Sequence, residues 1–269
     1  MKRRLFLSGL AAAAGGCGWV GYVEPQLFEV THTRIRLSGL RPRRILHVSD
    51  IHMSDGMTAP ELERGFAAGL SQRPDLICFT GDFVSATRGF DHAGLRRILL
   101  GAADTARSFA VLGNHDGGLW LNRHGDNSST EFLSDLIRST GVRLLHNESV
   151  EDDDLTLIGV GDLWSGEFEP SLAFAGANGG KAKIVLCHNP DGKDALRGFK
   201  WDLMLSGHTH GGQARIPGIH PTWTPVKDKR FVSGLYDWEG RQLFISRGLG
   251  SPKHVRAFCR PEVSMLYLG

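Results

Sequence analysis

The sequence predicts an α/β fold in which helices pack outside a β-sheet arrangement, and two observations support it. Short apolar runs of strand length alternate with segments in which apolar residues recur every three or four positions. Polar side chains directly follow most of these apolar runs, as expected where strands end in loops. The 269 residues carry 31 basic and 29 acidic side chains, a balance that does not suggest a nucleic-acid partner.

Residues 1–24 are interpreted as a targeting segment that precedes the fold. Residues 2–4 are basic, and an uncharged stretch rich in alanine and glycine follows over residues 5–23. This order is typical of an export signal, and Arg3-Arg4 before an apolar residue resembles a twin-arginine signal. We therefore expect the twin-arginine machinery to export the chain across a bacterial inner membrane.

The fate of that segment is left open by the sequence. Residues 12–14 are three alanines that suit cleavage, whereas Cys17 only loosely resembles a lipidation site. A retained stretch of 19 residues, from 5 to 23, would just span a bilayer, which needs about 20. We expect a periplasmic or membrane-anchored protein, or one at the cytoplasmic face if the signal is not used.

Residues 25–269 are interpreted as one domain, because no repeat or flexible linker divides them. Alternating apolar positions predict opening strands within residues 27–37, and apolar spacing from Leu62 to Phe66 and Leu70 predicts a helix. In order, the first half is expected to hold strands at 43–50, 75–80 and 109–112, with helices at 61–70 and around 95–99.

The second half repeats this alternation less regularly. A helix is expected at 131–139, and strands at 142–145, 155–160, 183–187, 202–205, 231–236, 242–246 and 263–268. The acidic residues 151–154 are interpreted as a solvated turn before a strand. Cys78 and Cys187 lie inside apolar runs, which favours buried free thiols over disulfides.

Metal-ligand side chains follow five of the predicted strands. In chain order they are Asp50-Ile51-His52, Gly81-Asp82, Gly113-Asn114-His115-Asp116, His188-Asn189 and Gly207-His208-Thr209-His210. Ligands of α/β sheets gather outside the carboxyl ends of strands, so these side chains are expected to converge on one site.

The chemistry of these side chains indicates a metal centre. Carboxylate, amide and imidazole groups without a thiolate suit manganese, iron or zinc better than magnesium or calcium. The candidate ligands are Asp50, His52, Asp82, Asn114, His188, His208 and His210. Seven ligands exceed the four that one tetrahedral zinc requires, so two metal ions are the simpler interpretation.

The joint series Asp-x-His, Gly-Asp, Gly-Asn-His-Asp, His and Gly-His-x-His resembles the calcineurin-like metallophosphoesterase family over roughly residues 40–269. Residues 188–191, 207–213 and 246–250 are similar to a bacterial branch of small membrane-associated phosphoesterases, some exported by the twin-arginine route. The resemblance implies a four-layer αββα sandwich: two mixed sheets packed face to face, flanked by helices, with a dinuclear site at strand carboxyl ends.

The resemblance also implies a role for each candidate residue. Asp50, His52 and His210 would hold one metal, and Asn114, His188 and His208 the other, with Asp82 bridging both and His115 acting as the catalytic imidazole. The cofactors would be two divalent ions, manganese first, with iron and zinc as alternatives. A hydroxide shared by the metals would attack an anionic phosphoryl group in line.

The expected function is hydrolysis of phosphodiester or pyrophosphate bonds, with a phosphoester substrate that is lipid-linked or part of the cell envelope. An alternative is the UDP-2,3-diacylglucosamine pyrophosphatase activity of lipid A synthesis that some relatives have, although export disfavours a cytoplasmic nucleotide sugar. A non-catalytic scaffold or lipid-binding protein is less favoured, because the ligand set is intact. The oligomeric state is open.

Several residues depart from the pattern or remain ambiguous. Ser85 stands where protein serine/threonine phosphatases have the Asp that orients the catalytic His, which argues against that branch and leaves the partner of His115 open. Asp116 and Asp191 are expected to bond loop backbone rather than metal, and His220 to lie in a surface loop. The sequence does not decide whether Trp120, Trp164 and Trp223 shape a pocket or pack in the core.

Overall fold

A computed structural model describes residues 18–86, 89–125, 130–177, 179–221 and 223–269. Its strands are β1 Glu29–Ile35, β2 Arg43–Val48, β3 Leu76–Thr80, β4 Arg107–Val111, β5 Arg143–Leu144, β6 Glu148–Asp152, β7 Leu155–Gly159, β8 Ala182–Leu186, β9 Leu203–Ser206, β10 Gly234–Trp238, β11 Arg241–Ile245 and β12 Glu262–Leu268. Its α-helices are α2 Ala59–Leu70, α3 His92–Thr105, α4 Gly118–Arg123, α5 Glu131–Arg138, α6 Pro170–Ala173 and α7 Gly192–Ala195.

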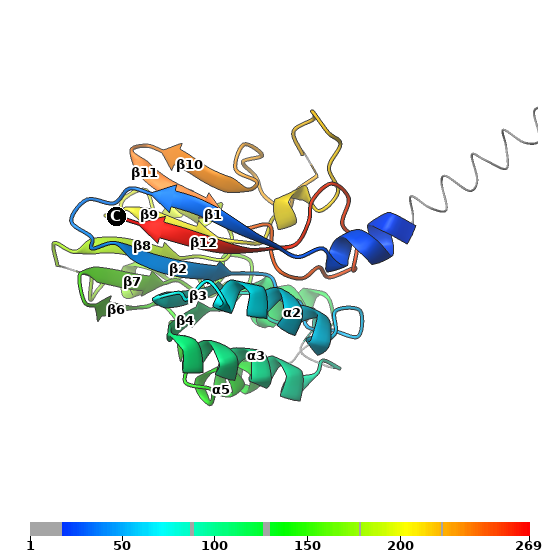
Figure 1. Cartoon of the computed structure of the whole chain (residues 1–269). Helices are drawn as coiled ribbons and strands as arrows, with labels where there is room; N and C mark the ends of the chain where they lie inside the picture. Colours follow the sequence, from blue (N-terminus) through cyan, green and yellow to red (C-terminus); the bar gives the residue numbers. More distant parts are fainter. Residues whose placement is uncertain (1–17, 87–88, 126–129, 178, 222) are drawn as a thin grey trace, which may run out of the picture.

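The strands form two six-stranded mixed sheets that pack face to face (Figure 1). The first sheet has the order β1-β12-β2-β3-β4-β5 and the second β10-β11-β9-β8-β7-β6. Strands β2 to β5 run parallel, as do β7, β8, β9 and β11, whereas β12 is antiparallel to β2. The predicted fold of two mixed sheets flanked by helices is confirmed.

Alternating side chains of each strand separate into distinct cores. Ile45 on β2 faces the second sheet, while its neighbour Leu46 faces the helices. On β7, Leu157 points between the sheets and Ile158 points to the outer face. This period of two is what lets a strand bury both faces, and it explains why the central strands read as continuous apolar runs.

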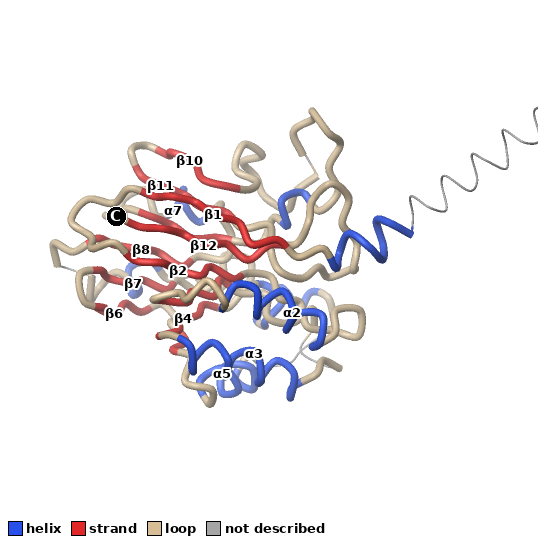
Figure 2. Tube along the Cα trace, in the orientation of Figure 1, coloured by secondary structure: helices blue, strands red, loops and turns tan. Residues whose placement is uncertain are grey.

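The helical layers differ in thickness. Helices α2, α3 and α5 cover one face of the first sheet (Figure 2). Helix α2 begins with a capping box, in which the backbone N–H of Thr58 bonds the Glu61 carboxylate at 3.1 Å. Over the second sheet, the described residues contribute the four-residue helices α6 and α7, together with the stacked rings of Trp201 and Trp238. Loops therefore complete the fourth layer.

Three sequence predictions of secondary structure need correction. A single edge strand, β1, replaces the opening strands expected at 27–37. The acidic run is not wholly a solvated turn, because residue 152 is buried at the end of β6, where it bonds Arg43 at 3.2 Å. The strand expected at 231–236 begins only at Gly234, because Phe231 packs in the outer core as part of a loop.

The targeting segment falls largely outside the described residues, which start at Gly18. Two short helical turns follow, η1 Trp19–Val23 and η2 Glu24–Gln26. They contact the body of the domain, since the backbone N–H of Arg256 donates to the Val20 carbonyl at 3.0 Å. Within the part of the chain that the structure describes, no helix has the length and apolar character needed to cross a bilayer.

Candidate metal centre

All seven candidate ligands meet at the carboxyl ends of parallel strands from both sheets. Strands β2, β3 and β4 of the first sheet and β8 and β9 of the second each end just before one of the five loops. In Figure 2 these loops gather at the end of the sheets opposite the labelled C-terminus. The face-to-face packing of the sheets thus brings together side chains that are up to 160 residues apart, from Asp50 to His210.

One group of side chains consists of Asp50, His52, Asp82 and His210, each of which offers a ligand atom within 4.8 Å of the others. The Nε2 atoms of His52 and His210 are 3.1 Å apart. The distance from His52 Nε2 to Asp82 Oδ2 is 3.4 Å, as is that from His210 Nε2 to Asp50 Oδ1. We call Asp50, His52 and His210 the first half-site.

A second group consists of Asp82, His188 and His208, again within 4.8 Å of one another. His188 Nε2 lies 3.2 Å from Asp82 Oδ2 and 3.1 Å from His208 Nδ1. The amide oxygen of Asn114 is 3.2 Å from the same nitrogen of His188. We call Asn114, His188 and His208 the second half-site, and Asp82 belongs to both groups.

The proton positions in the second half-site favour a bound cation. His188 Nδ1 is 2.7 Å from the Thr80 carbonyl and His208 Nε2 is 2.9 Å from the Pro225 carbonyl. A carbonyl only accepts, so both of these nitrogens carry protons. A metal ligand must also lose the proton on its coordinating nitrogen, and in that state His188 Nε2 and His208 Nδ1 face each other at 3.1 Å with lone pairs. A metal ion between them turns this repulsion into two ligand bonds, so the donor set fits a metal.

Burial shapes the charge of the centre, since each candidate ligand is at most 6% exposed. Burial lowers the pKa of His52 and of His208 to about 3, which keeps both rings neutral, as metal ligands must be. Burial also lowers the pKa of His188, but the Asp82 carboxylate outweighs it and raises the value to about 10. Two buried carboxylates therefore attract positive charge, and the centre is compatible with two divalent metal ions.

The backbone of the centre is strained. Asp50, His52, Asp82, His208 and His210 all have φ between 50° and 68°, a region that side chains with a Cβ rarely adopt. They make up five of the twelve non-glycine residues with positive φ in the described ranges. Such strain persists only where the surrounding structure imposes it, and it clusters at functional sites.

The glycines of the motifs allow the loops to approach the ligands closely. A Cβ on the motif glycine at position 207 would collide with the Asp50 carboxylate, and one at 113 would lie 2.9 Å from His188 Nδ1. These glycines are therefore required for the ligands to share one site.

Residues 43–212 match the sequence pattern of the calcineurin-like phosphoesterases, which covers more than half of the chain. The chain belongs to the calcineurin-like phosphoesterase family. The family resemblance predicted from the five motifs is confirmed, and so is the expectation of a hydrolase.

Relatives of the phosphoesterase extend along its whole length. It is 35% identical to phosphodiesterase YaeI of Escherichia coli, over all of this chain and 99% of that protein. It is 28% identical to UDP-2,3-diacylglucosamine pyrophosphatase LpxG of Chlamydia muridarum, over 92% and 91% of the two chains. It is also 29% identical to metallophosphoesterase YkuE of Bacillus subtilis, over 100% and 98%. The family thus includes phosphodiesterase and pyrophosphatase relatives.

His115 is held by a backbone group that the sequence did not reveal. Its Nδ1 lies 2.9 Å from the carbonyl of Ser85, and its backbone N–H donates to Asp82 Oδ1 at 2.9 Å. Ser85 therefore supplies the orienting contact through its main chain, in the place where a carboxylate was missing. Because the carbonyl fixes the proton on Nδ1, Nε2 is the ring nitrogen available for proton transfer.

Trp120 on helix α4 and the loop residues Trp164 and Trp223 line the pocket above the centre. A cavity of about 240 Å³ is lined by Asp82, Asn114, His115 and His208 of the centre and by Trp120, Trp164 and Trp223. The Trp120 and Trp164 rings are 4.8 Å apart, and Trp164 meets the His208 ring edge-on at 4.4 Å. The choice that the sequence left open is settled, because these side chains form a pocket wall.

Asp116 and Asp191 bond loop backbone, as predicted, but they join separate loops. Asp116 accepts from the backbone N–H of Phe83 and of Gly113, both at 2.8 Å, so it ties together the loops after β3 and β4. Asp191 accepts from the backbone N–H of Lys227 at 2.6 Å and so anchors the loop whose Pro225 carbonyl holds His208.

Arg256 is a residue that the sequence analysis missed. Its guanidinium is fully buried and donates to the carbonyls of His210 at 3.0 Å and Gly248 at 3.2 Å. A single arginine in a loop gives no sequence signal of burial, because its partners are main-chain carbonyls from distant segments. His220, by contrast, lies on an exposed loop, as expected.

Proposed function

We propose that the phosphoesterase hydrolyses a phosphodiester or pyrophosphate bond with two divalent ions, manganese by preference. The observation that carries this proposal is the pair of ligand groups that share Asp82 and open on the pocket lined by His115. In the proposal Asp50, His52 and His210 hold one ion, Asn114, His188 and His208 hold the other, and Asp82 bridges them.

The ions would activate water and neutralise the phosphoryl oxygens. The chain's own contribution is positioning and proton transfer. His115 is half-buried at the pocket, with Nδ1 donating to the Ser85 carbonyl and its ring 4.9 Å from that of His52. When protonated, it can donate from Nε2 to the leaving oxygen. The Ser85 carbonyl accepts from Nδ1 in either protonation state, so it holds the ring in one orientation throughout proton transfer.

The pocket supports a substrate with an apolar or aromatic part. Trp120, Trp164 and Trp223 offer ring faces beside the metal centre, where a lipid-linked or base-containing leaving group would pack. A phosphoester of the cell envelope or a phospholipid meets this requirement. The Escherichia coli relative is a phosphodiesterase, which agrees with the proposed bond type.

The direct test uses Asp82→Ala and His115→Ala with an activated aryl phosphodiester and Mn²⁺. Asp82→Ala should abolish turnover, and His115→Ala should lower it by about 100-fold or more. Asp104→Ala, at an exposed position of α3, is the matched control. Undiminished turnover in either of the first two variants would refute the mechanism.

A second candidate is UDP-2,3-diacylglucosamine pyrophosphatase activity, favoured by the relative from Chlamydia that carries this name. Export opposes it, because a cytoplasmic nucleotide sugar would not meet a periplasmic enzyme. We propose that the N-terminal sequence directs twin-arginine export and leaves the protein periplasmic or membrane-anchored. Fractionation of cells that express an epitope-tagged full chain separates the two cases. A purely cytoplasmic protein that hydrolyses the nucleotide-sugar lipid would favour the second candidate.

A further inference from the structure

Exposed apolar side chains gather on one face of the molecule. In the described ranges, eleven large apolar side chains are exposed, and seven of them lie in three segments. These seven are Trp19, Tyr22, Val23, Ile216, Ile219, Trp223 and Phe258. The remaining four, Leu119, Phe132, Leu172 and Leu235, lie on separate elements. Scattered exposed side chains are ordinary, whereas a gathered set indicates an interaction surface.

The three segments are joined to one another by hydrogen bonds. His254 Nδ1 donates to the Gly21 carbonyl at 3.1 Å, which joins η1 to the loop before β12. The same loop joins the 213–223 loop, because the backbone N–H of Arg215 donates to the Ala257 carbonyl at 2.8 Å. Figure 1 shows these segments at the end of the sheets that carries the metal centre. We call residues 19–23, 215–221, 223 and 253–260 the apolar face.

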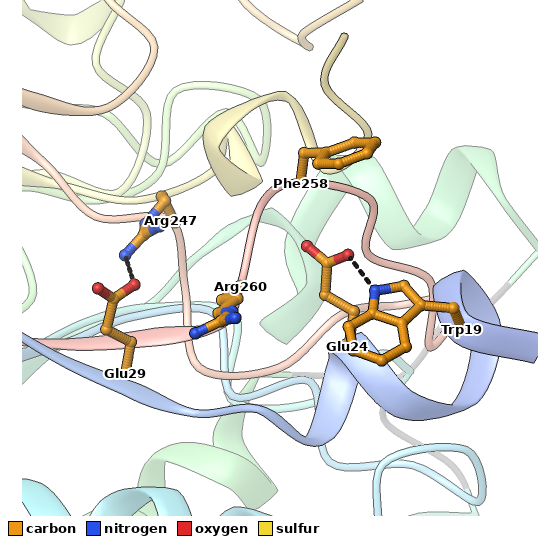
Figure 3. Close-up of a pocket in the computed structure, with 6 residues that line it drawn as sticks. All are labelled: Trp19, Glu24, Glu29, Arg247, Phe258 and Arg260. Carbon is orange, nitrogen blue, oxygen red and sulfur yellow. Dashed lines mark hydrogen bonds and ion pairs between the residues drawn. The ribbon is translucent and has the colours of Figure 1, made fainter. Parts of the chain in front are cut away.

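Two cavities on this face connect its side chains. One cavity of about 520 Å³ is lined by Trp19, Phe258 and Arg260, together with Glu24 and the ion pair between Glu29 and Arg247 (Figure 3). Phe258 also lines the next, with Ile216 and Ile219. Phe258 is thus the point at which the helical turn and the long loop meet.

The charge of the apolar face is positive. Its three segments contain no acidic residue, and the nearest one along the chain, Glu24, is buried and accepts from Trp19 Nε1 and the Cys259 backbone N–H. Lys253 and Arg260 are exposed on the same face, and Arg215 is half-buried. A surface that combines apolar and aromatic side chains with cations is complementary to an anionic lipid bilayer.

The N-terminal sequence enters the molecule at the same face. The described chain begins at Gly18, directly before Trp19, and residues 1–17 carry the basic and apolar sequence predicted for membrane targeting. Any membrane contact that residues 1–17 make is therefore only a few residues from the apolar face. This position favours a bilayer over a soluble protein as the partner.

We propose that the apolar face docks on the surface of an anionic phospholipid bilayer. Ile216, Ile219 and Phe258 enter the interfacial layer, with Arg260 and Lys253 beside the lipid phosphates. Trp223 belongs both to this face and to the wall of the metal pocket, so docking places the mouth of the pocket at the lipid surface. The proposal extends the proposed function, but it does not depend on which phosphoester bond is cleaved.

The test compares two triple variants of the full chain in co-sedimentation with phosphatidylcholine vesicles that contain phosphatidylglycerol. Ile216→Ser, Ile219→Ser and Phe258→Ser together should weaken vesicle binding by about 10-fold or more, since each removes several interfacial CH₂ groups. The control combines Phe132→Ser, Leu172→Ser and Leu235→Ser, which are also exposed but lie elsewhere. It should bind vesicles like the unaltered protein.

Charge is tested separately with Arg260→Gln. This variant should weaken binding to phosphatidylglycerol vesicles by about 5-fold and leave binding to pure phosphatidylcholine unchanged, because one cation near an anionic surface contributes about 1 kcal/mol. Equal loss on both vesicle types would contradict the assigned role of Arg260.

A fluorophore separates docking of the apolar face from anchoring by the N-terminal sequence alone. In a Cys17→Ser background, a polarity-sensitive dye on Ile219→Cys should shift to the blue with vesicles, and a dye on Leu172→Cys should not. The other three cysteines are buried. The proposal would be overturned if the dye at position 219 showed no blue shift with vesicles and the variant with Ile216, Ile219 and Phe258 substituted bound vesicles as tightly as the unaltered protein.

Two further readouts make the outcome unambiguous. Light scattering without lipid should show that the unaltered protein does not dimerise through the apolar face. A dimer that dissociates when Ile216, Ile219 and Phe258 are substituted would assign this face to a second copy of the chain and overturn the proposal. Turnover of a soluble aryl phosphodiester should be equal in the unaltered protein and both triple variants. Failure of the hydrolytic function would leave vesicle binding intact, so the two proposals fail separately.

Discussion

The two half-sites share Asp82 but hold their histidines differently. In the second half-site, the outer nitrogens of His188 and His208 donate to backbone carbonyls at 2.7 and 2.9 Å. In the first, His52 Nδ1 faces the Ser85 hydroxyl at 3.3 Å, and His210 Nδ1 faces the Arg256 guanidinium at 3.5 Å. The histidines of the two half-sites are therefore held by different groups: backbone carbonyls in the second, and a hydroxyl and a guanidinium in the first.

The partner of the outer ring nitrogen affects how tightly each histidine binds a metal. A carbonyl fixes the ligand tautomer and makes the imidazole more basic. A guanidinium only donates, so His210 Nδ1 accepts from Arg256 and the ring proton is placed on Nε2, which faces the ligand cluster. That proton must leave before Nε2 can bind a metal. The positive charge of Arg256 also repels a nearby cation. We therefore expect the second half-site to bind its metal more tightly and to fill first. Ligand identity alone therefore does not set the metal affinity of a half-site.

The largest effect is expected from Asp82→Asn, which removes the carboxylate that both half-sites use. Metal content after dialysis should fall below one ion per chain, and turnover should fall by more than about 1,000-fold. Elemental analysis and the phosphodiesterase assay measure the two quantities, with Asp104→Asn as the control. Loss of only one ion would show that Asp82 serves a single half-site.

The half-sites are compared directly by His188→Ala and His52→Ala. Under titration with a competing chelator, His52→Ala should keep one tightly bound ion, whereas His188→Ala should lose it and bind the remaining ion about 10- to 100-fold more weakly. Both side chains are fully buried, so the two substitutions are matched in size and burial. The reverse order of affinities would contradict the expectation that the second half-site binds its metal more tightly.

A smaller effect concerns acid stability beneath the second half-site, where the Thr80 hydroxyl lies 2.8 Å from His47 Nε2. Burial lowers the pKa of His47 to about 3. In the unfolded chain the pKa of His47 is near 6.5. Between about pH 6.5 and pH 3, His47 therefore binds a proton in the unfolded chain but not in the folded one. The free energy of unfolding falls as the pH falls, by about 2 kcal/mol from pH 7 to pH 5.

Urea unfolding of the chelated protein at pH 7 and pH 5 tests this expectation. In His47→Gln the free energy of unfolding should depend on pH less steeply, by about that same 2 kcal/mol. His32→Gln, on the exposed side of β1, is the control and should keep the original dependence. An unchanged pH dependence in His47→Gln would exclude His47 as the source.

The smallest effect is expected from Ser85→Ala. The substitution removes the hydroxyl beside His52 but keeps the carbonyl that orients His115. Affinity of the first half-site should drop by no more than about 5-fold, as for one weak hydrogen bond, and turnover at saturating metal should hardly change. Calorimetric metal titration and steady-state kinetics measure both. A large loss of turnover would show that the hydroxyl orients the catalytic ring.

Local patterns predicted most of the strands and the seven candidate ligands, but not Arg256, which packs against His210. The strand before Asp50 and the strand before Asp82 were predictable, because a buried parallel strand is apolar along its length. The loop that follows such a strand is where polar side chains appear in the sequence. Strand β6 was missed because its acidic residue 152 is satisfied by Arg43, which lies 109 positions away. Such long-range pairing leaves no local pattern.

By itself, the sequence determined the fold class, the family and the set of polar side chains at the strand ends, because these depend on composition and spacing along the chain. Only the tertiary structure decided that the Ser85 carbonyl orients His115, that Arg256 faces His210, and that the three segments of the apolar face adjoin. Main-chain carbonyls are present at every residue, so only the folded positions decide which of them bond. The two half-sites differ through these contacts.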